Sequence, residues 1–178
     1  MPTTLDIREP GLNVLPPGVE RHTVNMGGLT GLQIFPDDQI EIINEEGNQI
    51  CEIICFDKNG KSELGILSLK ENIKKSFIKE ILNNNDESSL ITKLQLKKRN
   101  LNINNSKSSI IFDKDTPSGE KVKLKSKDKC YVIFSAPKNE MLISDQNPSG
   151  DLTIFIKRAK ITKDKELSII PDPVFEPN

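Results

Sequence analysis

The chain has no tryptophan, one tyrosine (Tyr131) and one histidine (His22) among its 178 residues. A hydrophobic core must therefore be built from aliphatic side chains, mainly Ile and Leu. A chain of this length suits one domain with a core of substantial size. With 35% hydrophobic and 29% charged residues, the sequence is on the polar side but is not of the disordered type.

No apolar run approaches the roughly 20 residues that would cross a bilayer. The segment Met1-Pro2-Thr3-Thr4-Leu5-Asp6 also lacks the basic flank and the apolar stretch of a signal peptide. The three cysteines cannot all pair, which favours free thiols in a reducing compartment over a secreted disulfide framework. We therefore expect a cytoplasmic protein with no membrane partner.

Lysine is absent from residues 1–57, where two Arg stand against ten acidic residues and give a net charge of −8. Residues 58–138 carry 18 basic and nine acidic residues, a net charge of +9, and the remaining 40 residues give −2. Such a dipole could mark a partner surface. Lys, Asn and Ile are over-used throughout, however, and Arg is rare. We favour a compositional bias as the explanation.

The sequence divides into an extended N-terminal arm (1–17), a β-rich domain (18–166) and a Pro-rich linker to a following domain (167–178). Apolar and polar residues alternate through the first part of the domain, which predicts strands at 19–24, 29–35, around 40–42 and at 49–57. Gly47 and Asn48 tolerate the positive φ of a tight hairpin. We therefore predict a meander whose acidic residues lie mainly in turns and on the solvent face.

The apolar period then changes from strand to helix. After a short strand predicted around 64–67, Ser68 and Glu71 have the spacing of a capping box. Leu69, Ile73, Phe77 and Ile81 follow at helical spacing and predict an amphipathic helix from about 69 to 83. A second helix is predicted within 86–99, around Leu90, Ile91 and Leu94. A strand beginning at Leu94 is the alternative.

Short apolar runs separated by turn-forming residues return in the second half of the chain. They predict strands at 110–112, 122–124, 131–134, 141–143 and 152–156. Many short strands with few helices are typical of an all-β architecture. The expected fold is thus mainly β, a β-barrel or sandwich with one or two inserted helices.

The residues suggest no catalytic or metal site. Cys51, Cys55 and Cys130 could form a Cys₃His metal site with His22. Cys51 and Cys55 are four residues apart in one strand, however, which separates their sulfurs by about 13 Å, too far for one tetrahedral ion unless a bulge intervenes. Buried free cysteines usually act as small apolar residues. His22 lies in a strand without an obvious partner. We name no catalytic, cofactor-binding or metal-ligating residue.

Nucleic-acid binding is not expected either. The glycines of Gly27-Gly28-x-x-Gly31 precede a strand instead of a helix, so they do not form a phosphate-binding loop. The basic middle region lacks the aromatic residues on which bases stack.

The sequence G-L-Q-I-F-P-D-D-Q-I-E-I-I-N-E-E-G-N-Q-I-C-E at 31–52 resembles the urea-carboxylase-associated, aminomethyltransferase-linked domain family. In that family Gly-x-Gln-x precedes an acidic residue and an aromatic, and here Gly47, Gln49, Cys51 and Phe56 stand near those places. The segment L-N-V-L-P-P-G-V-E-R at 12–21 is similar to the start of bacterial chains of the trimethylamine-N-oxide demethylase type. The resemblance covers residues 6–57.

This resemblance implies a parent enzyme that converts trimethylamine N-oxide to dimethylamine and formaldehyde, with tetrahydrofolate capturing the one-carbon unit and zinc or iron as its metal. The Cys/His-rich cluster of the metal-bearing copy of the domain is missing here. The resemblance therefore implies a non-catalytic N-terminal module whose partners are neighbouring domains or subunits, with a homo-oligomer left open. The alternative is a stand-alone β-rich binding module with no enzymatic parent.

Overall fold

The structure, a computed structural model, describes residues 15–138 and 150–160. Two antiparallel four-stranded sheets pack face to face, with strand orders β1-β8-β3-β6 and β2-β7-β4-β5. We call them the first and the second sheet. The first contains β1 (Val19–Val24), β8 (Leu152–Lys157), β3 (Gln39–Asn44) and β6 (Glu120–Lys125). The second contains β2 (Leu29–Ile34), β7 (Cys130–Ser135), β4 (Cys51–Asp57) and β5 (Ser108–Phe112).

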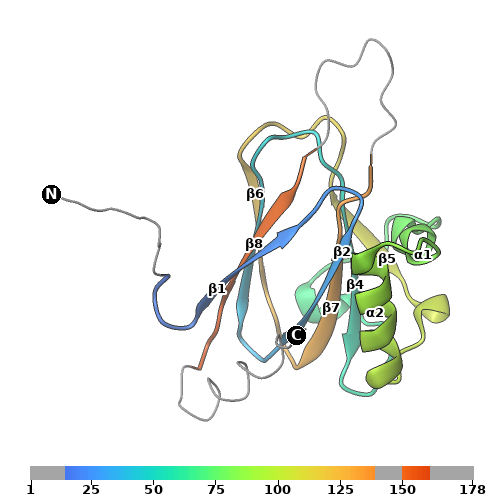
Figure 1. Ribbon diagram of the computed structural model, residues 1–178. Helices are drawn as coiled ribbons and strands as arrows, with labels where there is room; N and C mark the ends of the chain where they lie inside the picture. Colours follow the sequence, from blue (N-terminus) through green and yellow to red (C-terminus); the bar gives the residue numbers. More distant parts are fainter. Residues whose placement is uncertain (1–14, 139–149, 161–178) are drawn as a thin grey trace, which may run out of the picture.

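The predicted mainly β fold is confirmed, and the architecture is a sandwich. Helices α1 (Phe77–Leu82) and α2 (Glu87–Lys98) form a third layer on the outer face of the second sheet (Figure 1). Two short 3₁₀ helices, η1 (Leu64–Leu67) and η2 (Ile103–Asn105), complete the segment between β4 and β5. All helices of the described residues therefore belong to one insertion between two paired strands.

The hydrophobic core has two parts. The larger part fills the space between the sheets and consists of aliphatic residues, the three cysteines and two phenylalanines, Phe112 and Phe134. The smaller part lies between the second sheet and the helices, where Ile54, Phe56 and Ile133 meet Ile78 and Leu82. The scarcity of aromatic residues is thus met with Ile and Leu in the sandwich interior, as the composition predicted.

The predicted meander is wrong. The first four strands match the predicted positions closely, but they alternate between the sheets, so β1 and β3 lie in one and β2 and β4 in the other. Gly47 and Asn48 do have positive φ values of 80° and 62°. Their turn carries the chain across the sandwich and does not close a hairpin. Alternation in the sequence identifies the buried face of a strand, but it contains no information about the neighbouring strand.

The predicted helix at 69–83 is also wrong over its first half. Ser68 is the left-handed residue that ends η1, with φ of 60°, and α1 begins only after Ser76. The run Leu64–Leu67, predicted as a strand, is the 3₁₀ helix η1. Ile73 forms an isolated bridge with Ser108 of β5 instead of a helical turn. Pairing with this sheet edge outweighs the local helical pattern.

The second predicted helix is confirmed as α2, which Asp86 caps by accepting a hydrogen bond from the Ser89 amide at 2.8 Å. The predicted strands at 110–112, 122–124, 131–134 and 152–156 lie within β5 to β8. The strand at 141–143, the linker at 167–178 and all but the last three residues of the arm at 1–17 lie outside the described residues.

Candidate functional site

The cysteines are part of the core between the sheets. Cys51 and Cys55 point to the same face of β4 as Ile53, as expected, and all three thiols are buried and free. Burial raises the pKa of the Cys51 thiol, and a hydrogen bond with Cys130 together with burial raises that of Cys55. Both thiols are therefore protonated at neutral pH, a state unsuited to nucleophilic attack or metal binding.

His22 has a partner, contrary to the expectation. Its Nε2 lies 3.0 Å from Glu20 Oε1 on the same face of β1. Glu20 also receives two hydrogen bonds from the guanidinium of Arg158, at 2.8 and 3.0 Å. Burial acts to raise the pKa of Glu20, but the hydrogen bonds from His22 and Arg158 outweigh it and lower that pKa to about 2. The carboxylate is therefore a fixed anion within an ion-pair network and not a proton-transfer group.

Arg158 and Asp38 form the centre of this network at one end of the sandwich. Arg158 Nη1 donates to Asp38 Oδ2 at 2.8 Å and to the Gln33 carbonyl at 2.9 Å. Asp38 is completely buried and also accepts the amides of Phe35 and Ala159, both at 2.9 Å. Arg158 follows β8 of the first sheet, and Gln33 belongs to β2 of the second. These contacts therefore tie the two sheets together.

A second acidic residue, Glu52, was expected on the solvent face but is completely buried in β4. Its carboxylate accepts a hydrogen bond from Ser76 Oγ at 2.6 Å and another from the Ile78 amide at 2.9 Å. Ser76 in turn accepts from the Lys79 amide at 3.2 Å and caps α1. Glu52 thus anchors the start of α1 to the second sheet. Glu52 therefore lies neither in a turn nor on the solvent face, whereas Asp38 lies in the turn between β2 and β3 as predicted but is buried.

The residues that carry the family resemblance have structural roles. Gln49 is buried, and its Nε2 donates to the carbonyls of Ile50 and Pro137 at 2.7 and 2.9 Å. A side chain on Gly47 would meet the backbone of Thr116 and Ser118 at 2.9 and 2.8 Å, so only glycine fits. Cys51 and Phe56 are core residues of β4. Gly47 and Gln49 thus hold the β3–β4 crossing against neighbouring loops.

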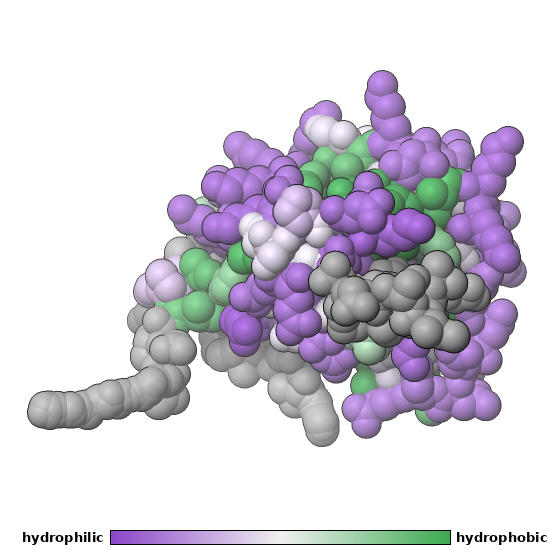
Figure 2. All heavy atoms as spheres, turned by 90° about the horizontal axis from the view of Figure 1, so that it is seen from above, coloured by the Kyte–Doolittle hydropathy of each residue, from purple (hydrophilic) through white to green (hydrophobic). Residues whose placement is uncertain are grey.

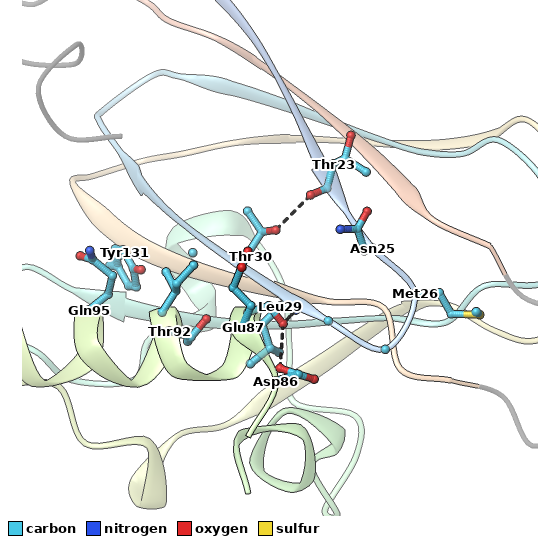
Figure 3. A pocket seen from close by; sticks show the side chains of 15 residues that line it. Thr23, Asn25, Met26, Leu29, Thr30, Asp86, Glu87, Thr92, Gln95 and Tyr131 are labelled. Atoms are coloured by element: carbon cyan, nitrogen blue, oxygen red, sulfur yellow. Dashed lines mark hydrogen bonds between the residues drawn. The ribbon is translucent and has the colours of Figure 1, made fainter. Parts of the chain in front are cut away.

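A groove of about 480 Å³ lies between α2 and the β1–β2 turn (Figure 3). Gly31 and Tyr131 both line it, and the absence of a side chain on Gly31 leaves room for the Tyr131 hydroxyl. Ser88 of α2 accepts the Leu29 amide of β2 at 3.3 Å, and Thr30 donates to the Thr23 carbonyl at 3.1 Å. These bonds hold the groove walls in place.

The groove offers binding chemistry. Its walls present backbone groups of a glycine-rich turn, hydroxyl groups, the carboxylates of Asp86 and Glu87 and the apolar side chain of Ile91. Burial raises the pKa of Tyr131, and Arg99 lies over its ring at 4.4 Å, so the phenol is held neutral and rigid. The groove runs beside β2, an edge strand of the second sheet. An extended or small polar ligand matches this lining better than a reacting substrate.

Sequence reasoning missed Arg158, Asp38, Glu52 and Tyr131 as structurally important residues. A weak signal existed for Glu52, since it is the one charged residue in the run Cys51–Phe56 of otherwise apolar residues. A charge in the middle of a buried strand requires a partner. Arg158 and Asp38 are 120 residues apart, and no local pattern connects them.

Within residues 15–138 and 150–160, no set of three or more His, Cys, Asp or Glu side chains is arranged to hold a metal ion. Over the same residues, no helix has the length and hydropathy needed to span a membrane. Hydrophilic side chains dominate the face of the molecule in Figure 2, with smaller hydrophobic areas between them.

No protein-family model matches the chain. The sequence is 32% identical over 171 residues to a trimethylamine-oxide aldolase of Ruegeria pomeroyi, an alignment that covers 96% of this chain and 22% of that protein. The chain thus spans about one fifth of the length of the curated relative that it matches. By this similarity, the protein is related to one segment of a trimethylamine-oxide aldolase.

Proposed function

We propose that the chain is a non-catalytic structural and assembly module, N-terminal in a longer bacterial demethylase. The parent enzyme converts trimethylamine N-oxide to dimethylamine and formaldehyde and transfers the one-carbon unit to tetrahydrofolate. The observation that carries the proposal is the alignment, which runs through nearly the whole chain but matches only 22% of the aldolase. The simplest explanation of these two coverages is that the chain corresponds to one module of a larger enzyme.

The side chains support a structural role. In the described residues, the buried carboxylates Asp38 and Glu52 each accept at least two hydrogen bonds that fix backbone or helix positions. Glu20 and His22 bind one another, and Glu20 also binds Arg158. Catalytic acids and bases need access to a reacting group and a pKa near the working pH. These groups are engaged within the fold.

The donor set does not fit the zinc or iron of the parent enzyme. The thiols lie in the apolar core, while His22 lies on β1 beside Glu20. Bringing these groups to one ion would require the sandwich to open. We therefore assign the metal to other parts of the parent.

A formaldehyde-release assay tests the non-catalytic assignment. The 178-residue chain and the Ruegeria pomeroyi aldolase are each incubated with trimethylamine N-oxide. We expect release from the aldolase and none from the chain above a heat-inactivated blank. Turnover by the chain would place an active site in this module and overturn the proposal.

A chimera tests the assembly role. The segment of the aldolase that aligns with this chain is deleted in one variant and replaced by residues 1–178 in another. We expect the deletion to lose soluble assembly and the replacement to recover it together with turnover. A deletion variant that keeps the assembly and turnover of the intact aldolase would show that the module is dispensable.

The second candidate function is a stand-alone binding module, and the groove beside α2 favours it. The two functions differ in what the groove does. Gln95→Trp, which fills the groove from a half-buried position on α2, should leave the chimera active if the module serves assembly through other surfaces. Loss of ligand binding without loss of assembly would favour the binding function.

A further inference from the structure

Helix α2 exposes an apolar face to solvent. Leu90, Ile91 and Leu94 are exposed to 52%, 53% and 65%, whereas the residues that face the fold are Ser89, Thr92 and Leu96. The residues that predicted the helix are thus on its outer side. Exposed apolar side chains gathered on one helix face are characteristic of an interaction surface.

The outward face has an ordered composition. At 100° per residue, Glu87, Ile91, Leu94 and Lys98 fall within about 60° of one another around the helix axis, opposite the buried residues. We call these four residues the α2 stripe. Their spacings of four, three and four residues are those of a coiled-coil seam. The stripe begins with an acid, ends with a base and has two apolar residues between them.

The stripe is also symmetric about the middle of the helix. Glu87 and Lys98 are the first and last residues of α2, and Ile91 and Leu94 lie equally far from its midpoint. A two-fold axis through that midpoint places Glu87 of one helix opposite Lys98 of the other and Ile91 opposite Leu94. The stripe is therefore complementary to a second, antiparallel copy of itself in both shape and charge. A parallel pair would oppose Glu87 to Glu87.

We propose that two copies of this chain associate through antiparallel contact of their α2 stripes. The charges at both ends are available, since the ion pairs of the described residues involve neither Glu87 nor Lys98. Helix α2 lies on the outside of the molecule, where a second copy can reach it (Figure 1). The contact is about 16 Å long, so the interface is small and the fraction of dimer depends on protein concentration. This inference concerns a surface of the chain itself and stands independently of the proposed function.

Sedimentation velocity over a concentration series of the 178-residue chain tests the proposal. We expect wild-type chain to shift from monomer to dimer with rising concentration. Leu94→Glu places two charges at the centre of the contact and should raise the dissociation constant about tenfold or more. Lys93→Gln, on the same helix but outside the stripe, is the matched control and should associate as wild type. Circular dichroism confirms that each variant is folded.

Charge variants test the antiparallel arrangement. Glu87→Lys and Lys98→Glu each create like-charge pairs at both ends of the contact, and each should weaken self-association about fivefold at low salt. An equal mixture of the two variants restores opposite charges and should associate as strongly as wild type. A parallel contact already opposes like charges, so there the single variants would not be weaker.

A wild-type chain that stays monomeric at every soluble concentration overturns the proposal. So does a dimer that Leu94→Glu leaves unchanged, or a mixture of charge variants that associates no better than its components. A monomeric chain leaves the formaldehyde and chimera results untouched, so the failure of this inference is distinct from a failure of the proposed function.

Discussion

The two sheets of the sandwich differ in what covers their outer faces. The first sheet presents its outer face to solvent, and its strands β3 and β6 alternate apolar residues with Glu and Lys. The second sheet is covered on both faces, and the central strands β4 and β7 are buried along almost their whole length. A charged residue on the outer face of the first sheet, such as Glu41, therefore stays in contact with solvent, whereas Glu52 on the outer face of the second sheet is buried and requires partners.

The largest expected effect breaks the contact that ties the two sheets together. Arg158→Met leaves the buried carboxylate of Asp38 without its cation, and removing one partner of a buried pair costs about 3–5 kcal/mol. Urea denaturation measures the change in the free energy of unfolding. Lys157→Met, one residue away and exposed, is the control and should change stability by less than about 0.5 kcal/mol. Equal losses for the two variants would contradict the role assigned to Arg158.

The stability contribution of a glutamate can be compared between the outer faces of the two sheets. Glu52→Ala removes the acceptor of the Ser76 hydroxyl and the Ile78 amide on the covered sheet, which should cost about 2–3 kcal/mol. Glu41→Ala on the open sheet removes an exposed pair with Lys123 at 3.8 Å and should cost about 0.5 kcal/mol or less. Hydrogen exchange should show lost protection in α1 only for the Glu52 variant. Similar losses for both variants would contradict the difference between the sheets.

The pH dependence of stability reports on the first sheet through Glu20. Because its pKa falls from 4.5 to about 2 on folding, its contribution is fully present above pH 4.5 and is lost as the pH falls toward 2. Glu20 is partly exposed, so we expect a contribution of about 2 kcal/mol after screening. Denaturation between pH 6 and 2 should show a shallower decline for Glu20→Gln. An unchanged slope would exclude Glu20 as a source of the acid sensitivity.

The smallest effects separate the true helix cap from the predicted one. Ser76→Ala removes the cap of α1 and should cost about 1 kcal/mol. Ser68→Ala, at the site where the sequence predicts a capping box, should cost less than about 0.5 kcal/mol because no helix begins there. Thermal unfolding of the two variants shows which substitution costs more stability. A larger loss for Ser68→Ala would support the helix predicted from 69 to 83.

Strand positions were predictable because they depend on neighbouring residues. Val19–Val24 was located to the residue, and the mainly β class followed from the number of such segments. Pairing was not predictable, since it depends on residues far apart. Ser68 and Glu71 satisfied a local capping rule, yet the buried Glu52 fixed the start of α1 eight residues later. Tertiary hydrogen bonds can outweigh local helix signals.

The candidate site was even harder to predict from the sequence. The groove is formed by a turn at 25–28 and a helix beginning at Glu87, two segments that share no sequence motif. The α2 stripe was visible as apolar residues at helical spacing, but periodicity alone cannot tell an inward face from an outward one. The distinction requires knowing that Ser89 and Thr92 pack inward, where the Ser89 hydroxyl reaches the Ile81 carbonyl at 2.7 Å.

The pairing of β1 with β8 also bears on how the protein is made. Val19 pairs with Lys157, so β1 must wait until β8 has been synthesised before its hydrogen bonds can form. Until then β1 and β3 both lack β8, the strand that lies between them. Such distant pairing predicts slow folding and a nascent chain that exposes unpaired strand edges until β8 has emerged. A circular permutant that joins Lys160 to Val19 through a short loop keeps Arg158 and Ala159, would bring the two strands together at once and should fold faster.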